Sequence, residues 1–335
     1  MGAELAASWP AAAVAFAVAV LGTRRLLGWL TERRILDLPN HRSSHSLPTP
    51  RGGGLAVTPA ALAAWVMVAV STAQAGWIWT LAAGGGALMA ASWLDDRHSL
   101  PALPRLGVHA LAVTAGLLTL PGDALVFQGW LPVAADRVLT ALGWLWFVNL
   151  YNFMDGIDGI TGVETVSLGF GIALVAIVAG VAAPLAPLGI GLAAAAIGFL
   201  VWNWHPARIF LGDSGSVPLG FLLGGLLVHL AAAGHLAAAV ILPAYYLADA
   251  SITLGRRTLR GEKVWQAHRQ HFYQRAVQGG RSHDQVALAI LGANLVLGCA
   301  ALLSVTRPAT GVALGAAATA MLLTVLARWA GGGRP

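Results

Sequence analysis

Long apolar runs alternate with short polar breaks along this sequence, and the alternation constrains the fold more than any other feature. A helix needs roughly 17 to 25 apolar residues to cross a hydrocarbon core about 30 Å thick. Eleven such runs can be placed along the 335 residues. We therefore expect an all-α polytopic membrane protein with eleven transmembrane helices. The expected spans are 9–30, 53–71, 76–94, 105–121, 137–154, 162–180, 184–204, 215–233, 236–254, 285–305 and 309–329.

The composition excludes a water-soluble globule. Only 10% of the residues are charged and 57% are hydrophobic, with a mean hydropathy of +0.72, whereas soluble domains carry about 25% charged residues. The single cysteine, Cys299, excludes a disulfide framework and a cysteine-based zinc site. The first apolar run precedes its arginines, whereas a signal peptide carries its basic residues before the apolar stretch. We expect that run to be an uncleaved anchor.

Threading eleven spans places the connections alternately on two sides, and the basic residues fall mainly on one of them. Eighteen of the twenty Lys and Arg residues lie on one side, and only Arg137 and Arg307 lie on the other. Because basic residues concentrate in cytoplasmic loops, we predict an outside N-terminus and a cytoplasmic C-terminus. We expect residues 1–335 to form a single integral membrane domain whose cytoplasmic connections build the active site. These connections are 31–52, 95–104, 155–161, 205–214 and 255–284.

Nine of the fourteen acidic residues lie in those cytoplasmic connections. Most of the ones nearest the helix ends are Asp residues placed among Gly and Asn. Short carboxylates that meet at one membrane surface suit Mg²⁺, which takes oxygen ligands and completes its shell with water and substrate phosphates. Three motifs carry them: Leu94–Arg97 with Asp95 and Asp96, Asn149–Gly159, and Phe210–Ser216 with Asp213.

The second motif places Asn149, Asn152 and Asp155 three residues apart. Side chains at that spacing share one face of a helix, so we expect all three to point toward one site, with Asp158 close by. The alternative is that Asp155 and Asp158 only cap the sixth helix, as Asp often does. The paired Asn residues upstream favour the functional interpretation.

The third motif opens the eighth helix, where free backbone N–H groups attract phosphate oxygens. Asp213 is our candidate metal ligand there, and an N-cap by Asp213 or Ser214 is the simpler alternative. Just upstream, Asn203, His205 and Arg208 place polar groups at a depth where polarity is costly. They are therefore candidates for substrate binding.

The last cytoplasmic connection is rich in basic residues. For the stretch Arg256–Arg260 we prefer an anchor for anionic lipid. The segment His268–His271 differs, because His268 and His271 share a face of a helical turn and, with Arg269, offer donors for a diphosphate or for sugar hydroxyls. Two His residues without a third ligand nearby are a weak zinc signal.

Taken together, these motifs resemble the polyprenyl-phosphate N-acetylhexosamine-1-phosphate transferase superfamily, known also as glycosyltransferase family 4. The resemblance covers nearly the whole chain and rests on the motifs above in the family's order. It implies ten or eleven membrane helices in the bacterial inner membrane, an active site on the cytoplasmic face and dependence on Mg²⁺, with Mn²⁺ as an alternative. The implied reaction transfers a sugar 1-phosphate from a UDP-sugar to undecaprenyl phosphate and releases UMP.

The resemblance also implies roles for single residues. It assigns Asp213 and Asp95 to the metal, and Asp95 and Asp96 to the metal or the acceptor phosphate. It places Asp155 and Asp158 in the catalytic centre with the nucleotide. It gives Asn152 to the nucleotide, and His268 and His271 to the donor sugar or diphosphate. Our full set of candidate substrate-binding residues is Asn149, Asn152, Asn203, Arg208, His268, Arg269, His271 and Arg105.

The branch of the superfamily is suggested by two segments. Residues Asn40–Gly54, which include His41 and His45, and His268–Arg275 resemble the O-antigen-initiating branch, whose members use UDP-GlcNAc or 6-deoxy relatives. The run of three His typical of enzymes that use UDP-MurNAc-pentapeptide is missing, which counts against peptidoglycan precursor synthesis. That reaction remains the alternative within the superfamily.

We favour direct in-line attack by undecaprenyl phosphate, because a phosphate monoester has its second pKa near roughly 6 and needs no strong base. A covalent aspartyl-phosphate intermediate is the rival route. An ion-coupled secondary transporter is the alternative from another class, but its spans would carry ionisable groups near the bilayer midplane. A non-catalytic scaffold leaves the Asp motifs unexplained. We expect membrane lipid but no nucleic acid as a partner, and the small apolar helix surfaces also suit a homodimer.

Overall fold

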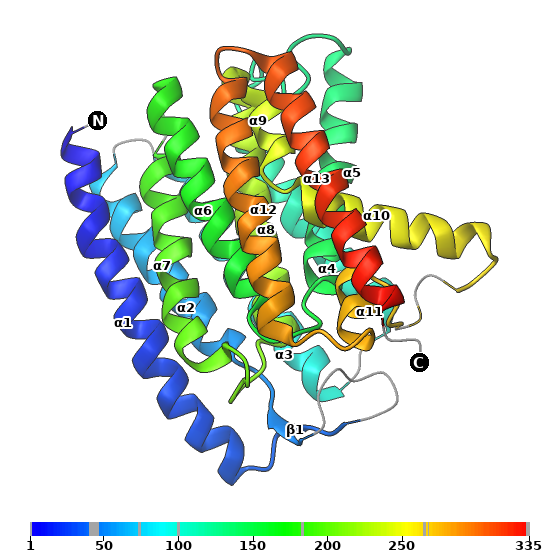
Figure 1. Ribbon diagram of the computed structural model, residues 1–335. Coiled ribbons are helices and arrows are strands. Elements are labelled where there is room, and N and C mark those ends of the chain that lie inside the picture. Colours follow the sequence, from blue (N-terminus) through cyan, green and yellow to red (C-terminus); the bar gives the residue numbers. More distant parts are fainter. Residues whose placement is uncertain are drawn as a thin grey trace.

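The computed structural model describes residues 2–39, 47–72, 75–98, 101–181, 184–263, 266 and 268–332, with side chains from residue 8 onward. Asn40–His45, part of the segment that suggested the O-antigen branch, lie outside the described residues. The described chain is a bundle of mostly long helices (Figure 1). Its elements are α1 (Gly2–Glu32), β1 (Leu36–Asp37), β2 (Thr49–Pro50), α2 (Gly54–Ser71), α3 (Gly76–His98), α4 (Ala102–Leu117), α5 (Val133–Phe153), α6 (Ile160–Ala179), α7 (Leu185–Asn203), α8 (Asp213–Leu230), the π-helical turn η1 (Ala231–His235), α9 (Leu236–Ile241), α10 (Ala244–Leu259), α11 (Phe272–Gln278), α12 (His283–Ser304) and α13 (Pro308–Gly331).

The expectation of an all-α polytopic membrane protein is confirmed. In the described part of the chain, eight helical segments are long and apolar enough to cross a membrane. The helix α4 is short of a full span at 16 residues, and Gly and Trp residues lower the hydropathy of α3. The count of eleven spans and the orientation of the termini stay predictions.

The expected ninth span, 236–254, is wrong as a single membrane helix. The helix α9 ends at Ile241, and α10 starts only after Pro243. Proline has no N–H to donate and favours a helix start over a helix interior. The new helix then carries Asp249, Arg256 and Arg257, and it projects sideways from the bundle (Figure 1). The apolar pattern did not reveal this change of direction.

The helix α8 occupies the centre of the bundle, and nearly all of its side chains are buried. It packs against α2, α3, α5, α6 and α7. Small residues make this close packing possible: a side chain at Gly224 would collide with the indole of Trp144 on α5, and one at Gly225 with Leu81 on α3. Small residues at helix contacts are the usual solution in membrane proteins, where backbones gain by approaching closely.

The polar connections gather at one end of the bundle, around the elements labelled β1, α3 and α11 in the lower part of Figure 1. The short strands β1 and β2 pair in antiparallel fashion, Leu36 with Pro50 and Asp37 with Thr49. The chain then pairs in parallel with the segment before α8, through a bridge between Arg51 and Phe210. Backbone pairing therefore joins the first and fourth of the expected cytoplasmic connections.

Candidate active site

Arg51 and three carboxylates form the centre of the polar end. The Nη2 atom of Arg51 lies 2.9 Å from Oδ1 of Asp96 and 2.8 Å from Oδ1 of Asp213. Backbone hydrogen bonds hold the arginine there, because Phe210 N donates to the carbonyl of Pro50 at 2.8 Å and Gly54 N to that of Leu211 at 2.8 Å. We call Arg51, Asp95, Asp96, Arg105 and Asp213 the acid–arginine cluster.

Asp213 is the first residue of α8, after Gly212 with a φ of 73°. The amides of Asp213 and Ser214 donate to the carboxylate of Asp96, at 3.4 and 3.2 Å. A carboxylate at a helix N-terminus is stabilised by the helix dipole and the free N–H groups. The two amides expected to face a phosphate are therefore occupied by Asp96, whose side chain is only 4% exposed.

The other half of the cluster faces a cavity of about 210 Å³ between α3, α4, α5 and α8. Arg105 Nη1 lies 2.6 Å from Oδ2 of Asp95 and 3.7 Å from Oδ2 of Asp213. Asn152 Nδ2 donates to the same Asp213 oxygen at 3.4 Å, and Ser216 Oγ donates to Asn152 Oδ1 at 2.6 Å. The cavity thus has a charged end, and its remaining lining is mostly apolar: Ala91, Ala102, Pro104, Leu106, Val108, Phe153 and Val217.

Asn149 and Asn152 both line this cavity, but Asp155 does not. The helix α5 ends at Phe153, so the three-residue spacing no longer predicts a shared face at Asp155. Its Oδ1 instead accepts a hydrogen bond from Thr161 Oγ1 at 2.6 Å. Desolvation raises the pKa of Asp155 to about 7, against the lowering effect of Thr161, and the nearby carboxylates of Asp213 and Asp96 raise it further.

Asp158 lies in a second cluster, which we call the Asp158 triad. Its Oδ2 atom is 2.6 Å from Nδ1 of His205 and 3.2 Å from Nδ1 of His283, and it accepts a hydrogen bond from Ala207 N at 3.1 Å. Burial alone would raise the pKa of this carboxyl, but the hydrogen bonds from the two imidazoles hold it below its ordinary value. Three connections, before α6, after α7 and before α12, therefore meet at one carboxylate.

The remaining candidates upstream of α8 have different surroundings. Asn203 is buried, accepts a hydrogen bond from Gly159 N at 3.0 Å and donates one to the carbonyl of Ile209 at 2.9 Å. Both ends of its amide therefore hold backbone in place. Arg208 is exposed, and its guanidinium lies 5.8 Å from the ring centroid of Trp202.

His271 is almost fully buried and anchors α11. Its Nδ1 lies 3.0 Å from Oδ1 of Asp249, which also accepts the amide of Phe272 at 3.1 Å, while Tyr273 N donates to Oδ2 at 3.3 Å. The hydroxyl of Tyr273 reaches the carbonyl of Phe153 at 3.3 Å, which places α11 beside the end of α5.

His268 is half-buried beside His271, with ring centroids 4.9 Å apart. Desolvation, with the positive charge of His271 and Arg257, lowers the pKa of His268 to about 4. The imidazole is therefore neutral near pH 7 and could offer a substrate one donor. Arg269, its neighbour, lines a different cavity from the acid–arginine cluster.

Three residues of these clusters were missed as candidates by the sequence reasoning: Arg51, Asp249 and His283. His205 was a candidate for substrate binding, but its pairing with Asp158 was not foreseen. Arg51 lies in the segment Asn40–Gly54, which was used only for its resemblance to the O-antigen-initiating branch. Asp249 is a lone carboxylate in an apolar run, and such a residue signals a specific partner. His283 carries no local signal, because it is simply the first residue of α12.

Two places offer ligands for a divalent cation. Asp95 and Asp213 present carboxylate oxygens, the hard donors that Mg²⁺ prefers. Among the described residues, only Asp158, His205 and His283 form a group of three whose ligand atoms all lie within 4.8 Å of one another. Two imidazoles and a carboxylate are more typical of zinc. By donor chemistry, the acid–arginine cluster is the better fit for Mg²⁺.

Comparisons with known proteins give a consistent family. The model of glycosyl transferase family 4 matches residues 77–231. A phospho-N-acetylmuramoyl-pentapeptide-transferase of Synechococcus is 30% identical over 257 residues, covering 65% of this chain and 68% of that protein. The chain belongs to glycosyl transferase family 4. The resemblance to the polyprenyl-phosphate N-acetylhexosamine-1-phosphate transferase superfamily is thereby confirmed.

Other relatives match more of the chain at slightly lower identity. A decaprenyl-phosphate N-acetylglucosaminephosphotransferase of Mycolicibacterium smegmatis is 29% identical over 301 residues, 75% of this chain and 71% of the relative. A probable undecaprenyl-phosphate N-acetylglucosaminyl 1-phosphate transferase of Bacillus subtilis is 27% identical over 270 residues, which cover 76% of this chain and 73% of the relative. Both matches extend well beyond the segment that the family model covers.

Proposed function

We propose that this protein transfers an N-acetylhexosamine 1-phosphate from a UDP-sugar to undecaprenyl phosphate and releases UMP. The reaction takes place at the cytoplasmic face of a bacterial inner membrane and uses Mg²⁺, with Mn²⁺ as a substitute. The observation that carries this proposal is the cavity of about 210 Å³, which has a charged end and a mostly apolar lining. A phosphate carried on an isoprenoid chain has the same division between a charged head and an apolar tail.

The charged end of this cavity suits the acceptor phosphate. Arg105 is 40% exposed and lies against Asp95, so its guanidinium can donate to a phosphate oxygen without leaving the cluster. Asp213 and Asp95 are the proposed metal ligands, with Asn152 beside them. When bound, the cation would supply charge neutralisation between two anionic reactants. Asn149 and His109 line the same wall and complete its polar part.

The state of the carboxylates favours direct attack by the acceptor. Asp96 is held by Arg51 and by two backbone amides, and Asp155 is held by Thr161. Neither carboxylate is presented freely as a nucleophile. Undecaprenyl phosphate needs little activation, because its second pKa near roughly 6 leaves it largely dianionic at about pH 7. Isolation of a phosphorylated Asp during turnover would establish the covalent route instead.

We assign the donor to the neighbouring part of the same membrane end. The Asp158 triad and His268 supply hydrogen-bonding groups for it, and Asp155 precedes Asp158 by three residues. Asn203 acts through Gly159 and Ile209, so it is a positioning residue in this scheme. Arg208 is exposed and has room to reach the nucleotide.

For the donor sugar we propose N-acetylglucosamine or a related N-acetylhexosamine. Two relatives carry N-acetylglucosamine in their names, and the product would initiate a surface polysaccharide such as O-antigen. The relative from Synechococcus is named for phospho-N-acetylmuramoyl-pentapeptide transfer, so UDP-MurNAc-pentapeptide is the donor to exclude. The chain lacks the three-His run associated with that substrate.

The test uses the purified full chain with radiolabelled UDP-sugars, undecaprenyl phosphate and Mg²⁺. We expect UMP release and a labelled lipid with UDP-GlcNAc or a 6-deoxy relative, and neither with UDP-MurNAc-pentapeptide. Asp213→Asn should abolish turnover while the variant stays folded. Asp123→Asn changes an exposed acid between α4 and α5, outside the candidate site, and should leave turnover at the wild-type value. A transporter would release no UMP, and normal turnover by Asp213→Asn would remove that residue from the metal site.

A further inference from the structure

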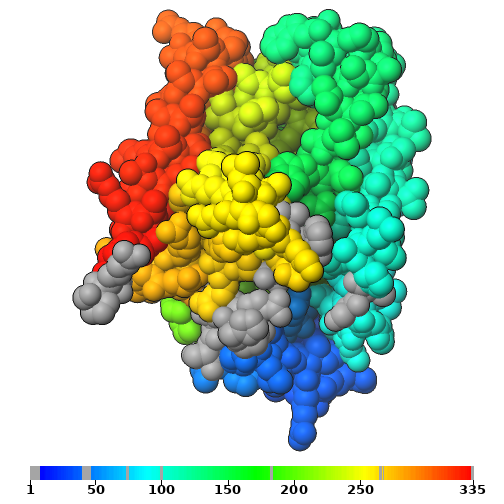
Figure 2. Space-filling model, turned by 90° about the vertical axis from the view of Figure 1, so that its right-hand side faces the viewer, coloured from blue at the N-terminus to red at the C-terminus, as the bar shows by residue number. Residues whose placement is uncertain are grey.

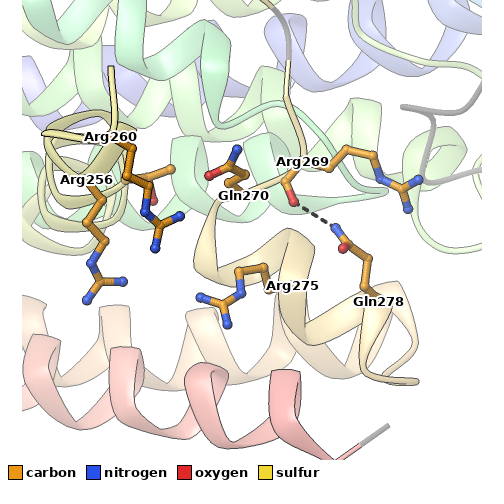
Figure 3. A pocket seen from close by; sticks show the side chains of 7 residues that line it. Arg256, Arg260, Arg269, Gln270, Arg275 and Gln278 are labelled. Atoms are coloured by element: carbon orange, nitrogen blue, oxygen red, sulfur yellow. Dashed lines mark hydrogen bonds between the residues drawn. The ribbon is translucent and has the colours of Figure 1, made fainter. Parts of the chain in front are cut away.

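A second cavity, of about 380 Å³, lies outside the candidate active site and shares no lining residue with the cavity of the acid–arginine cluster. It is built by the C-terminal half of α10, the connection that follows and α11. We call it the arginine pocket (Figure 3). It is lined by Thr253, Arg256, Arg260, Arg269, Gln270, Arg275 and Gln278.

The arginine pocket has a large excess of positive charge. The side chains of Arg256, Arg260 and Arg275 gather on one side of it, and that of Arg269 extends to the other (Figure 3). Within the described part of the chain, no carboxylate oxygen lies within 4.0 Å of Arg256, Arg260 or Arg275. Like charges held together in this way repel one another unless an anion lies between them.

The two carboxylates nearest in the chain are already engaged. Asp249 is fully buried and binds His271 and the start of α11. Glu262 pairs with Arg257 at 2.8 Å and accepts a hydrogen bond from Gln270 at 2.8 Å. Neither carboxylate neutralises the pocket, which leaves it able to accept an anionic ligand.

Several contacts give the pocket a defined shape. The guanidinium of Arg256 lies 5.0 Å from the ring centroid of Phe272, which orients it. Gln278 Nε2 donates to the carbonyl of Arg269 at 2.8 Å and ties the connection to the end of α11 (Figure 3). These contacts fix the positions of the lining residues, so the arginine pocket is a defined cavity and not only a basic stretch of sequence.

The position of the pocket indicates the source of the anion. The end of α11 packs on the end of α13, where a side chain at Gly279 would collide with the backbone of Trp329, and Arg281 lies 4.9 Å from the Trp329 ring centroid. The helix α13 is a candidate membrane span that ends at Gly331, and Trp is typical of the membrane–water interface. The pocket thus lies beside the end of a candidate membrane span, where lipid phosphates would be found.

The helix α10 supports the same placement. It projects from the bundle, and α11 and α13 lie beside it on one side of the space-filling view (Figure 2). Leu259 is 90% exposed next to Arg260, and Ile252 is 37% exposed one residue before Thr253. Apolar side chains beside arginines on one helix are typical of an element that lies in the interface and contacts both acyl chains and headgroups.

We propose that the arginine pocket binds the phosphate headgroup of an anionic phospholipid, at a site separate from those of the acceptor and the donor. The ligand contributes the negative charge that the residues lining the pocket lack. It would hold α10 at the membrane surface through contacts with both helices. The inference goes beyond the proposed function and does not depend on it.

The experiment compares lipid binding by the full chain in nanodiscs and by native mass spectrometry, with phosphatidylglycerol and phosphatidylcholine as probes. We expect the wild type to retain phosphatidylglycerol preferentially. Arg256→Gln/Arg275→Gln should weaken that binding roughly ten- to thirtyfold, from the contribution of each arginine near an anionic surface. The matched control is Arg24→Gln/Arg25→Gln, which removes two exposed arginines from the same predicted side of the membrane and should weaken binding less than about threefold.

Equal loss in the two double variants, or no loss in the first, would overturn the proposal. Thermal unfolding of each variant establishes that it is folded, and the exposed Arg275→Gln alone replaces the double variant if folding fails. The KM for the UDP-sugar should stay at the wild-type value. A raised KM, or displacement of the lipid by UDP, would place the donor diphosphate in the pocket and also overturn the lipid assignment.

Discussion

The guanidinium of Arg51 lies 2.8 Å from the carboxylate of Asp213, although 162 residues separate the two in the sequence. The same Nη2 atom reaches Asp96 at 2.9 Å. One arginine therefore holds together the ends of two helices, α3 and α8, at the point where the candidate active site begins. Its place depends on backbone pairing between the segments 50–54 and 210–212.

The first prediction concerns Arg51 itself. Arg51→Gln should lower turnover at least about tenfold, because Asp213 and Asp96 lose the cation that orients them. It should reduce the free energy of unfolding by about 1–2 kcal/mol, near the lower range for hydrogen bonds to charged groups, since the Arg51 side chain is 38% exposed. Steady-state kinetics and chemical unfolding measure the two effects. The control Arg97→Gln changes an exposed arginine at the same helix end, and equal behaviour of the two variants would contradict the prediction.

The second prediction is a pH dependence caused by Asp155, whose pKa is raised to about 7. An unfolded chain releases this proton near pH 4, so between about pH 4 and pH 7 the folded state binds the proton more tightly. The contribution of Asp155 to stability therefore falls as the pH rises through this window and levels off above it. Asp155→Asn should remove that part of the slope in unfolding curves measured from pH 5 to pH 8.

Thr161 provides the matched test of this pKa. Its hydroxyl lowers the pKa of Asp155 by hydrogen bonding to the charged form. Thr161→Val should move the end of the stability decline to a pH above 7, whereas Thr161→Ser keeps the hydroxyl and should leave it in place. Identical profiles for the two Thr161 variants would show that the hydrogen bond does not control the titration.

The third prediction concerns Asp249, the buried carboxylate that binds His271 and the amides at the start of α11. Asp249→Asn should reduce the free energy of unfolding by about 2–4 kcal/mol, because several buried donors lose a charged acceptor. The connection before α11 should become more sensitive to limited proteolysis, and the KM for the donor should rise. Asp123→Asn, on an exposed turn, is the control, and a wild-type proteolysis pattern in the Asp249 variant would refute the role.

The fourth prediction tests the close approach of α2 and α8. A side chain at Gly54 would collide with the backbone of Ser214 and Gly215, next to Asp213. Gly54→Ala should therefore separate the two helix ends and abolish turnover, with a clear loss of stability. Gly107→Ala on α4 meets nothing within 4 Å and should be neutral or stabilising by about 0.4–1 kcal/mol, through lower entropy of the unfolded chain. Thermal unfolding and turnover should be measured for Gly54→Ala and Gly107→Ala. Similar stability and turnover in the two variants would disprove the packing argument.

Much of the fold could be predicted from local patterns. The expected spans overlap the long helices closely, because length and hydropathy are properties of a continuous segment and need no partner. The break between α9 and α10 was missed, although Pro243 was visible in the sequence. The mean hydropathy of this run is still apolar, and only packing of α10 against α5 and α13 decides that the chain turns there.

The candidate site could be predicted only in part. The motifs around Asp95, Asn152 and Asp213 were recognised, and the structure brings these three residues to one cavity. The reason lies in chain order, since each motif follows or precedes a span and must lie near one membrane surface. The partners were harder to foresee: no sequence spacing connects Asp158 with His283, which is 125 residues further along.

The sequence by itself therefore determined the membrane environment, the family and the kinds of polar group at each helix end. Those properties depend on the composition of single segments, because the hydropathy of one segment is enough to decide whether it lies in the membrane or in water. The tertiary structure alone decided which carboxylates share an arginine, which imidazoles meet Asp158 and where Arg256, Arg260 and Arg275 come together. Such pairings depend on distances between distant turns, and those distances are set by how glycine-rich helices pack, to within the width of a methyl group.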